Sequence, residues 1–335
     1  MATIRDVARM AGVSVSTVSL VLHQPHRVSE PTTARVLQAV DALRYRPNGA
    51  ARDLRIRKTH TIAVFLRDLS GPFYSELIAA VERATSALGL TLIVSGRSTD
   101  HRQGSLRLLR EGRVDGAIVL DPEISWAELA AYSGPHLPVV VLNRMLPAPL
   151  ESAYLTAVAV DNEGGGYLAG RHLLERGFVH PAFIAGPVGS ETSQWRQQGF
   201  FRAYEEAGIS PTRVAVVHSD FTEPGGIQAM DALMARRVAM DAVFAANDEM
   251  ALGAMQVLTA PKSPPVRVAV MGFDDIRLAR YVRPTLSTIH QPMDELGTLA
   301  MDLLARAMGG ETRVPPRVLT TTLVVRESTT LLHPT

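Results

Sequence analysis

The 335-residue sequence contains no cysteine, so it has neither disulfide bonds nor metal sites built on thiolates. It also lacks any run of about 18 apolar residues, the length that a membrane-spanning helix requires. The first residues show no basic segment followed by an apolar stretch, which is the pattern of a secretory signal. These three absences predict a cytoplasmic protein with no part in a membrane.

The motifs of common catalytic and cofactor sites are missing as well. There is no G-x-S-x-G nucleophile motif and no phosphate loop ending in Gly-Lys-Ser/Thr. The ten histidines form no pair at positions i and i+4 that would bind a metal. The glycines after Glu163 do not match a nucleotide-binding loop, and we interpret them as a helix start that needs close backbone packing. The sequence therefore predicts no enzyme activity, no metal and no cofactor.

Positive charge is concentrated at the beginning of the chain. Residues 1–60 contain ten Lys and Arg against four Asp and Glu, whereas the remainder contains 24 basic and 29 acidic residues. A basic head on an acidic body is typical of a phosphate-binding module attached to a part that does not bind nucleic acid. A merely solvated basic face would give the same count, so the charge alone does not identify a DNA-binding head.

Three short helices are predicted in this head: Ile4–Ala11, Val15–Leu22 and Pro31–Arg44. Thr3 caps the first helix, with Asp6 three residues later as in a capping box, and Ser14 caps the second. Gly12 forms the turn between them. Two helices joined in this way match a helix-turn-helix, whose second helix lies in the DNA major groove.

From residue 61 onward, buried strands alternate with amphipathic helices, which predicts parallel sheets covered by helices on both faces. The number of strands indicates two such sheets, with a boundary near Asp161. We expect a first subdomain of residues 61–160 plus 288–325 and a second of residues 161–287. On this interpretation the late strands Ser287–His290 and Leu319–Val325 return to the first sheet. The fold class is thus an all-α head followed by a two-subdomain α/β body.

Several segments carry a resemblance that covers nearly the whole chain: TIRDVARMAGVSVSTVSLVL, RYRPNGAARDL, VDNEGGGYLAGRHL, FAANDEMALGAM and MGFDDIRLARYVRPTLSTIHQP. In this order they resemble the lactose-repressor (LacI/GalR) family. The resemblance implies a helix-turn-helix head over residues 1–47, a hinge over 48–60, and a body like periplasmic sugar-binding proteins over 61–335. It also implies that two chains form a homodimer on a pseudo-palindromic DNA operator.

By this resemblance the DNA-contacting residues are Thr3, Ser14, Val15, Ser16, Thr17, Ser19, Leu20, Arg27, Asn48, Ala51 and Leu54. The hydroxyls suit phosphate contacts, while Val15, Ser16 and Leu20 occupy the base-reading positions. None of these three side chains can make a bidentate contact to a base, so the operator sequence is not readable from them. Leu20 is alternatively a packing residue. The resemblance also implies that Leu54 wedges into the minor groove; a plain tether with an incidental leucine is the alternative.

In the body, the resemblance implies effector contacts from Phe73, Tyr74, Arg196, Phe221, Asn247 and Asp274. Carboxylate, amide and guanidinium groups can bridge neighbouring hydroxyls of a small polyol, and aromatic rings provide apolar faces for a sugar or a purine. We expect Arg196 to begin a helix, and Asp248 and Asp275 to serve as helix caps. Purine-responsive members carry an Arg at the position of Ser190, which favours a carbohydrate here.

The sequence therefore predicts a ligand-responsive transcriptional repressor that acts as a homodimer and is controlled by a small sugar or sugar-like effector. A regulator controlled by a purine nucleobase is the alternative within the family. A solute-binding receptor for transport shares the architecture of the body, but it would have a signal peptide and no basic head. The chain has no heptad tail before Thr335, so we expect no coiled-coil tetramer.

Overall fold

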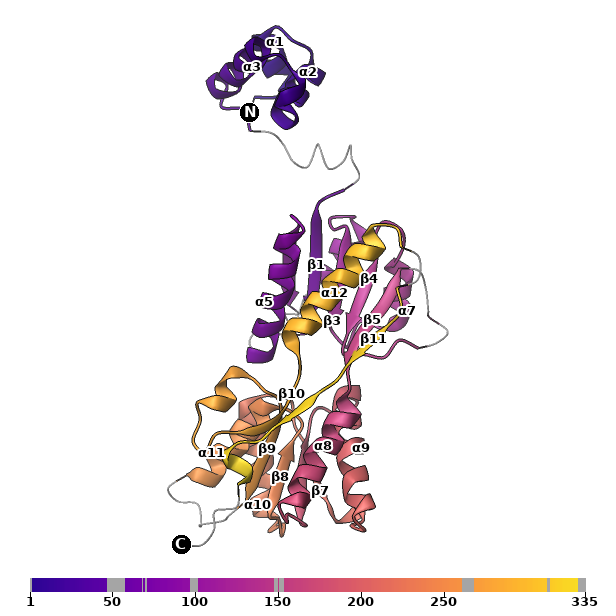
Figure 1. Ribbon diagram of the computed structural model, residues 1–335, viewed down its shortest axis with the longest axis vertical. Helices are drawn as coiled ribbons and strands as arrows, with labels where there is room; N and C mark the ends of the chain where they lie inside the picture. Colours follow the sequence, from indigo (N-terminus) through magenta and orange to yellow (C-terminus); the bar gives the residue numbers. More distant parts are fainter. Residues whose placement is uncertain are drawn as a thin grey trace. The chain divides into compact units, whose positions relative to one another are not determined.

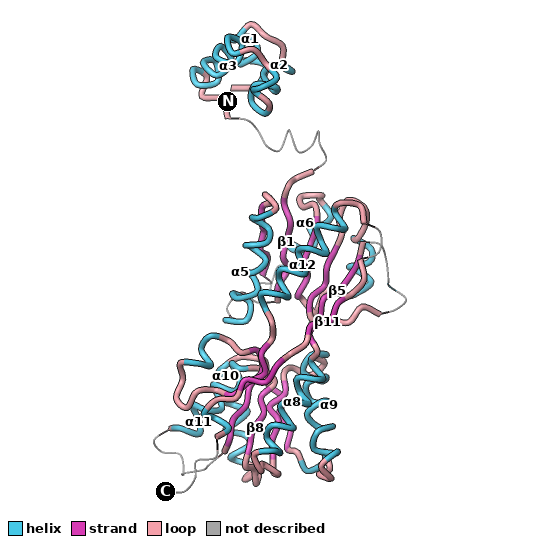
Figure 2. Tube along the Cα trace, viewed as in Figure 1, coloured by secondary structure: helices cyan, strands magenta, loops and turns pink. Residues whose placement is uncertain are grey.

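The computed structural model describes residues 2–46, 58–67, 69, 71–96, 102–147, 150, 154–260, 268–311 and 314–330. By its internal contacts the chain divides into two compact units, residues 1–59 and 60–335. Each unit is described by itself below (Figures 1 and 2). The predicted hinge residues Asn48, Ala51 and Leu54 lie outside the described residues.

The first unit is a head of three helices around a small apolar core. Its elements are α1 (Ile4–Ala11), α2 (Val15–His23), the 3₁₀ turn η1 (Pro25–Arg27) and α3 (Glu30–Ala42). Val7, Val18 and Val36, one from each α-helix, are fully buried at its centre. Both predicted caps are present, since Asp6 N donates to Thr3 Oγ1 and Thr17 N donates to Ser14 Oγ. The predicted helix-turn-helix fold of the head is confirmed.

The second unit contains two six-stranded sheets, each with helices on both faces. In chain order the strands of the first sheet are β1 (Thr61–Leu66), β2 (Thr91–Gly96), β3 (Gly116–Leu120), β4 (Val139–Leu142), β5 (Leu155–Val160) and β11 (Arg317–Leu319). Its spatial order is β11-β5-β4-β3-β1-β2, with every neighbouring pair parallel. We call this sheet with its helices the first lobe.

Alternation along β1 explains how helices cover both faces of the first sheet. Ile62 and Val64 pack on one side with α5 (Pro72–Ala87) and α12 (Met293–Met308). Ala63 and Phe65 point the other way and pack with α6 (Arg102–Arg110) and α7 (Trp126–Tyr132). Because successive side chains of a strand point to opposite faces, a fully apolar strand must be buried on both sides.

The second sheet has the order β12-β10-β9-β8-β6-β7, and only the β10–β12 pair is antiparallel. Its strands are β6 (Pro181–Ala185), β7 (Ala215–His218), β8 (Ala242–Ala245), β9 (Ala269–Asp274), β10 (Ser287–His290) and β12 (Thr322–Val324). The remaining elements are α8 (Asn162–Glu175), α9 (Glu191–Glu206), η3 (Pro211–Arg213), α10 (Glu223–Ala235), α11 (Asp248–Thr259), η4 (Arg277–Arg280) and η5 (Glu327–Thr329). This second lobe is held by one apolar core.

The path of the chain between the two lobes corrects the predicted boundaries. Strand β10 pairs with β9 and strand β12 pairs with β10, so both belong to the second sheet (Figure 1). Helix α12 and strand β11 are the late elements that return to the first lobe. The predicted strand Leu319–Val325 is in fact two strands, because the chain leaves one sheet after Leu319 and enters the other at Thr322. Apolar strand patterns do not specify which sheet a strand joins.

Helices α8 and α9 pack with their backbones in close contact, as predicted for the glycines after Glu163. A methyl group at Gly199 would overlap the carbonyl oxygen of Glu163, and one at Gly166 would overlap the carbonyl oxygen of Arg196. Backbone atoms cannot move aside as a flexible side chain can. The two glycines therefore fix how deeply α9, which carries Arg196, lies against α8.

We expect Gly199→Ala to destabilise the second unit by about 1–3 kcal/mol, the usual cost of overpacking a close contact. The measurement is the urea dependence of unfolding, followed by circular dichroism. Gly134→Ala is the matched control, since a methyl group there meets no atom within 4 Å. Equal stability of the two variants would contradict the close contact between α8 and α9.

Candidate functional site

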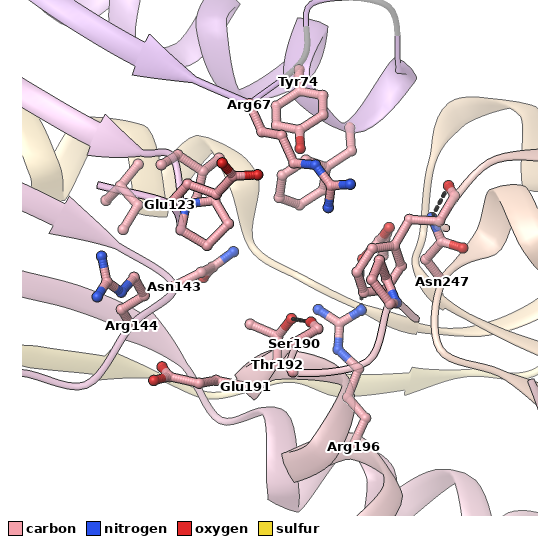
Figure 3. A pocket seen from close by; sticks show the side chains of 18 of the residues that line it. Arg67, Tyr74, Glu123, Asn143, Arg144, Ser190, Glu191, Thr192, Arg196 and Asn247 are labelled. Carbon is pink, nitrogen blue, oxygen red and sulfur yellow. Dashed lines mark hydrogen bonds and ion pairs between the residues drawn. The ribbon is translucent and has the colours of Figure 1, made fainter. Parts of the chain in front are cut away.

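A cavity of about 420 Å³ lies between the two lobes, at the carboxyl ends of strands from both sheets. Its lining includes all six predicted effector residues: Phe73, Tyr74, Arg196, Phe221, Asn247 and Asp274. Figure 3 shows side chains from both lobes that converge on this space. Loops at the carboxyl ends of parallel strands are where open α/β sheets bind ligands, which explains why residues far apart in sequence meet there.

Arg196 reaches the cavity from the second turn of α9. Our expectation that it begins this helix is wrong, because α9 starts at Glu191 with Ser190 as its cap. The guanidinium is buried: Nε donates to Asn162 Oδ1 at 2.8 Å and Nη1 donates to the Ala246 carbonyl at 2.5 Å. Burial lowers the pKa of Arg196 to about 10, which still leaves it a cation at neutral pH. These two hydrogen bonds leave N–H groups for a ligand, as Arg has five donors.

Asp274 lies 3.6 Å from Arg196, measured between Oδ1 and Nη1, and it is equally buried. Gln291 Nε2 donates to the same carboxylate oxygen at 2.5 Å. Burial raises the pKa of Asp274 to about 6, and the nearby Arg196 opposes this rise only in part. The φ angle of Asp274 is +123°, a conformation that is costly for a residue with a side chain. The pair therefore occupies a strained and desolvated corner of the cavity.

Asp248 and Asp275 are not helix caps, which corrects our expectation. Asp248 is fully buried, and it accepts hydrogen bonds from the Thr288 hydroxyl at 2.6 Å and from the Ile276 N–H at 2.9 Å. Asp275 forms an ion pair with Arg326 at 2.5 Å. Asp248 thus holds the loop after β9 through Ile276, and Asp275 ties the same loop to Arg326, so both fix the backbone next to Asp274. Composition alone does not distinguish such a tertiary role from capping.

Asn247 combines capping with a second contact. Its Oδ1 accepts from Met250 N at 3.0 Å, which caps α11, and its Nδ2 donates to the Phe221 carbonyl at 2.9 Å. One N–H of the amide remains for a ligand. Phe221 has a φ of +70°, and the hydrogen bond from Asn247 helps to hold its backbone there. The position of Phe221 thus depends on the side chain of Asn247.

The first lobe contributes the predicted aromatic pair and, in addition, three polar residues that the sequence analysis missed. Phe73 and Tyr74 form an edge-to-face pair with ring centroids 5.3 Å apart at the start of α5. Arg67 directly follows β1, and Asn143 and Arg144 directly follow β4; all three line the cavity. The position of each just after a strand was the signal that could have identified them. Buried Asn143 Oδ1 has no hydrogen-bond partner among the described residues.

In the head, the predicted DNA contacts gather around the start of α2. Ser14 Oγ lies 2.7 Å from Ser16 Oγ and 2.8 Å from Thr17 Oγ1, so three hydroxyls form one cluster. Val15 and Ser16 are exposed, as base contacts require, whereas Ser19 and Leu20 are partly buried. At the edges of this surface, Thr3 caps α1 and the exposed Arg27 donates to Gln24 Oε1 at 3.0 Å. Both roles of Leu20, base contact and packing, remain compatible with its partial burial.

Comparisons with known proteins now add to this geometry. A family model for bacterial regulatory proteins of the lacI family matches residues 3–48, and one for a periplasmic binding protein-like domain matches residues 170–329. The ribose operon repressor of Escherichia coli strain K12 is 39% identical over 311 residues, which cover 91% of this chain and 92% of that protein. The chain belongs to the lactose-repressor family. As a member, it is a DNA-binding transcriptional regulator, and its relatives are repressors rather than enzymes.

Other relatives in the lactose-repressor family agree with this assignment. The transcriptional repressor PurR of Edwardsiella ictaluri is 36% identical over 314 residues, 91% of this chain and 89% of that protein. A crystal structure of the lac repressor dimer bound to operator and an anti-inducer is 29% identical, with a TM-score of 0.84 over 98% of this chain and 99% of that one. A family member from Enterococcus faecium with bound ribose is 30% identical, with a TM-score of 0.72 over 81% and 99% of the two chains.

The described residues contain neither a membrane-spanning helix nor a metal-binding cluster. No helix there is long and apolar enough to cross a membrane. No group of three or more His, Asp or Glu side chains in that part of the chain is arranged to hold a metal ion.

The raised pKa of Asp274 predicts a pH-dependent stability. The carboxyl of Asp274 binds a proton more tightly in the folded protein than in the unfolded chain, where its pKa is 3.8. Protonated Asp274 therefore stabilises the fold fully below pH 3.8, and this stabilisation is lost as the pH rises through about 6. On lowering the pH from 7 to 5, we expect the free energy of unfolding to rise by about 1 kcal/mol relative to Asp274→Asn, which cannot ionise.

The measurement is chemical unfolding of both proteins at a series of pH values. Asp231→Asn, on an exposed position of α10, controls for the removal of a carboxyl group. A difference between the natural protein and Asp274→Asn that stays constant from pH 7 to pH 5 would contradict the raised pKa.

Proposed function

We propose that the protein is a cytoplasmic, homodimeric repressor that binds a pseudo-palindromic operator and is controlled by a small sugar in the cavity between its lobes. The observation that carries this proposal is the convergence of all six predicted effector residues on that cavity. The head supplies an exposed helix with a hydroxyl cluster at its start, which suits the phosphate contacts that position a reading helix.

The chemistry of the cavity suits a polyol. Asp274 can accept hydrogen bonds from hydroxyl groups, while Arg196 and Asn247 have N–H groups that can donate to them. The rings of Phe73 and Phe221 offer apolar faces against which the carbon skeleton of a sugar packs. The relative named as a ribose operon repressor and the family member with bound ribose support a monosaccharide effector.

A purine nucleobase is the second candidate, favoured by the same two aromatic rings and by the similarity to PurR. Ser190 argues against it. At the position where purine-responsive members carry an Arg, this serine caps α9, and its hydroxyl lies 3.2 Å from Thr192 Oγ1. A serine already engaged in this way offers a base much less than a guanidinium does.

A homodimer follows from the geometry of DNA recognition. One head covers a half-site, so two heads related by two-fold symmetry read a palindrome. A ligand that contacts both lobes changes the relative free energy of their arrangements, and it shifts the population toward the arrangement that it binds more tightly. In this way, binding of a ligand in the cavity would change the affinity of the protein for its operator.

Selection of bound duplexes from a random DNA pool by the full-length protein tests the proposal. We expect a palindrome with a pliable central step, and we expect a monosaccharide to change the affinity for that duplex. If purine bases change it and sugars do not, the effector class is wrong. Failure to enrich any sequence, with and without pooled sugars and purines, would contradict the proposal as a whole.

Leu54→Ala should weaken specific operator binding several-fold or more, because the resemblance implies that this leucine wedges between base steps and repays the bend with added contacts. The measurement is fluorescence anisotropy with the selected duplex at fixed salt. Leu88→Ala, which removes an exposed leucine at the end of α5, is the control. Unchanged operator affinity of Leu54→Ala would contradict the wedge and favour the alternative, a plain tether in which the leucine is incidental.

A further inference from the structure

The cavity has a second polar end, which the predicted effector contacts do not use. Arg67 and Asn143 lie on the first lobe, just beyond strands β1 and β4, whereas Arg196 and Asp274 lie on the second lobe. In Figure 3 the guanidinium of Arg67 and the amide of Asn143 point into the cavity. A ligand that fills this space therefore meets polar groups on both lobes.

The three guanidinium groups that line the cavity differ in whether their charge is compensated. Arg196 is beside Asp274. Arg144 lies over the ring of Trp126 at 4.4 Å, donates to the Ile124 carbonyl at 2.7 Å and is attracted by the nearby Glu191. Arg67 forms no hydrogen bond or ion pair with any residue that the structure describes.

No carboxylate among the described residues forms an ion pair with Arg67. Asp274 accepts from Gln291, and Glu191 lies near Arg144. Glu123 and Glu249 also line the cavity, and each has an interaction within the chain. A partly buried cation that faces a cavity without an ion pair from the described residues is electrostatically unfavourable, and a bound anion would lower that cost.

One neighbouring feature suits the same ligand. Asn143, which has a φ of +54° and a buried Oδ1 without a partner among the described residues, can accept from a hydroxyl group. One end of the cavity thus offers a cation and a hydroxyl acceptor together.

We infer that the effector is a sugar with an anionic substituent, a phosphate or a carboxylate, and that Arg67 binds this substituent. The inference rests on the proposed function and narrows its ligand class. The sugar hydroxyls contact Arg196 and Asp274 on the second lobe and Asn143 on the first, and the negative charge lies against the guanidinium of Arg67. An arginine can hold either anion through two parallel hydrogen bonds, so the substituent is defined here by its charge.

The test is isothermal titration of the full-length protein at pH 7.0 with matched ligands. The panel contains D-ribose, D-ribonate and D-ribose 5-phosphate, and D-glucose, D-gluconate and D-glucose 6-phosphate. We expect an acid or a phosphate to bind more tightly than its neutral parent. In Arg67→Gln, the ratio of anionic to neutral affinity should fall about tenfold or more, the scale of one charge-assisted hydrogen bond.

Three controls separate the role of Arg67 from a general effect. Arg67→Lys keeps the charge and should retain much of the preference for the anion. Arg110→Gln removes an exposed arginine on α6 and should leave the ratio unchanged. Operator affinity without ligand should be the same in all variants, which shows that they fold. The separate acid and phosphate series show which anion is the better ligand.

Two outcomes would overturn the inference, and they differ in what else they affect. If the neutral sugars bind as tightly as the anions, or if Arg67→Gln weakens both alike, Arg67 does not select an anion, while the proposed sugar-responsive repressor stands. If no sugar of either kind binds, the proposed effector class fails, and the role of Arg67 fails with it.

Discussion

The buried pair of Arg196 and Asp274 is the interaction on which the rest of the cavity depends. Two charges removed from water cost more than their mutual attraction returns unless other groups complete their hydrogen bonding. Here those groups come from separate parts of the chain: Asn162 on α8, the Ala246 carbonyl after β8, and Gln291 after β10. The ring of Phe273 adds a cation–π contact, 3.7 Å from the guanidinium carbon. Satisfying one ion pair therefore fixes α8, α9 and the ends of three strands relative to one another.

On the second lobe, the close backbone contact between α8 and α9 fixes the position of Arg196. The two lobes are linked by segments in which the chain crosses from one sheet to the other, at Asp161 and between Leu319 and Thr322. The crossing segments are hydrogen-bonded to each other, since Asp161 N donates to the Leu319 carbonyl at 2.8 Å and Thr321 Oγ1 donates to the Asp161 carbonyl at 3.2 Å. Figure 2 shows these segments running between the two lobes. The proposed effector, held by side chains of both lobes, would act on how the lobes are arranged across these crossings.

Contacts between residues distant in sequence explain two errors of the sequence analysis. The sequence of strand β10, Ser-Thr-Ile-His, suits either sheet, and only its pairing with β9 assigns it to the second. Asp248 resembles a helix cap in sequence, yet its carboxylate is bonded to Thr288, 40 residues away. Arg67 and Asn143 directly follow strands, a position typical of ligand-binding loops, but that position alone does not distinguish a polar residue that faces a cavity from one that faces solvent. For strand β10 and for Asp248, the deciding contact is with a residue distant in sequence.

The sequence by itself determined the caps of the head and the alternation of strands and helices, because turn chemistry and hydrophobic period act over a few neighbouring residues; the six effector residues came from the family resemblance. Tertiary structure alone decided which sheet the late strands join, that Arg196 is paired with Asp274, and that Arg67 has no ion pair with a described residue. Whether a charge has a partner depends on distances across the folded chain, and those distances are set by packing rather than by local order.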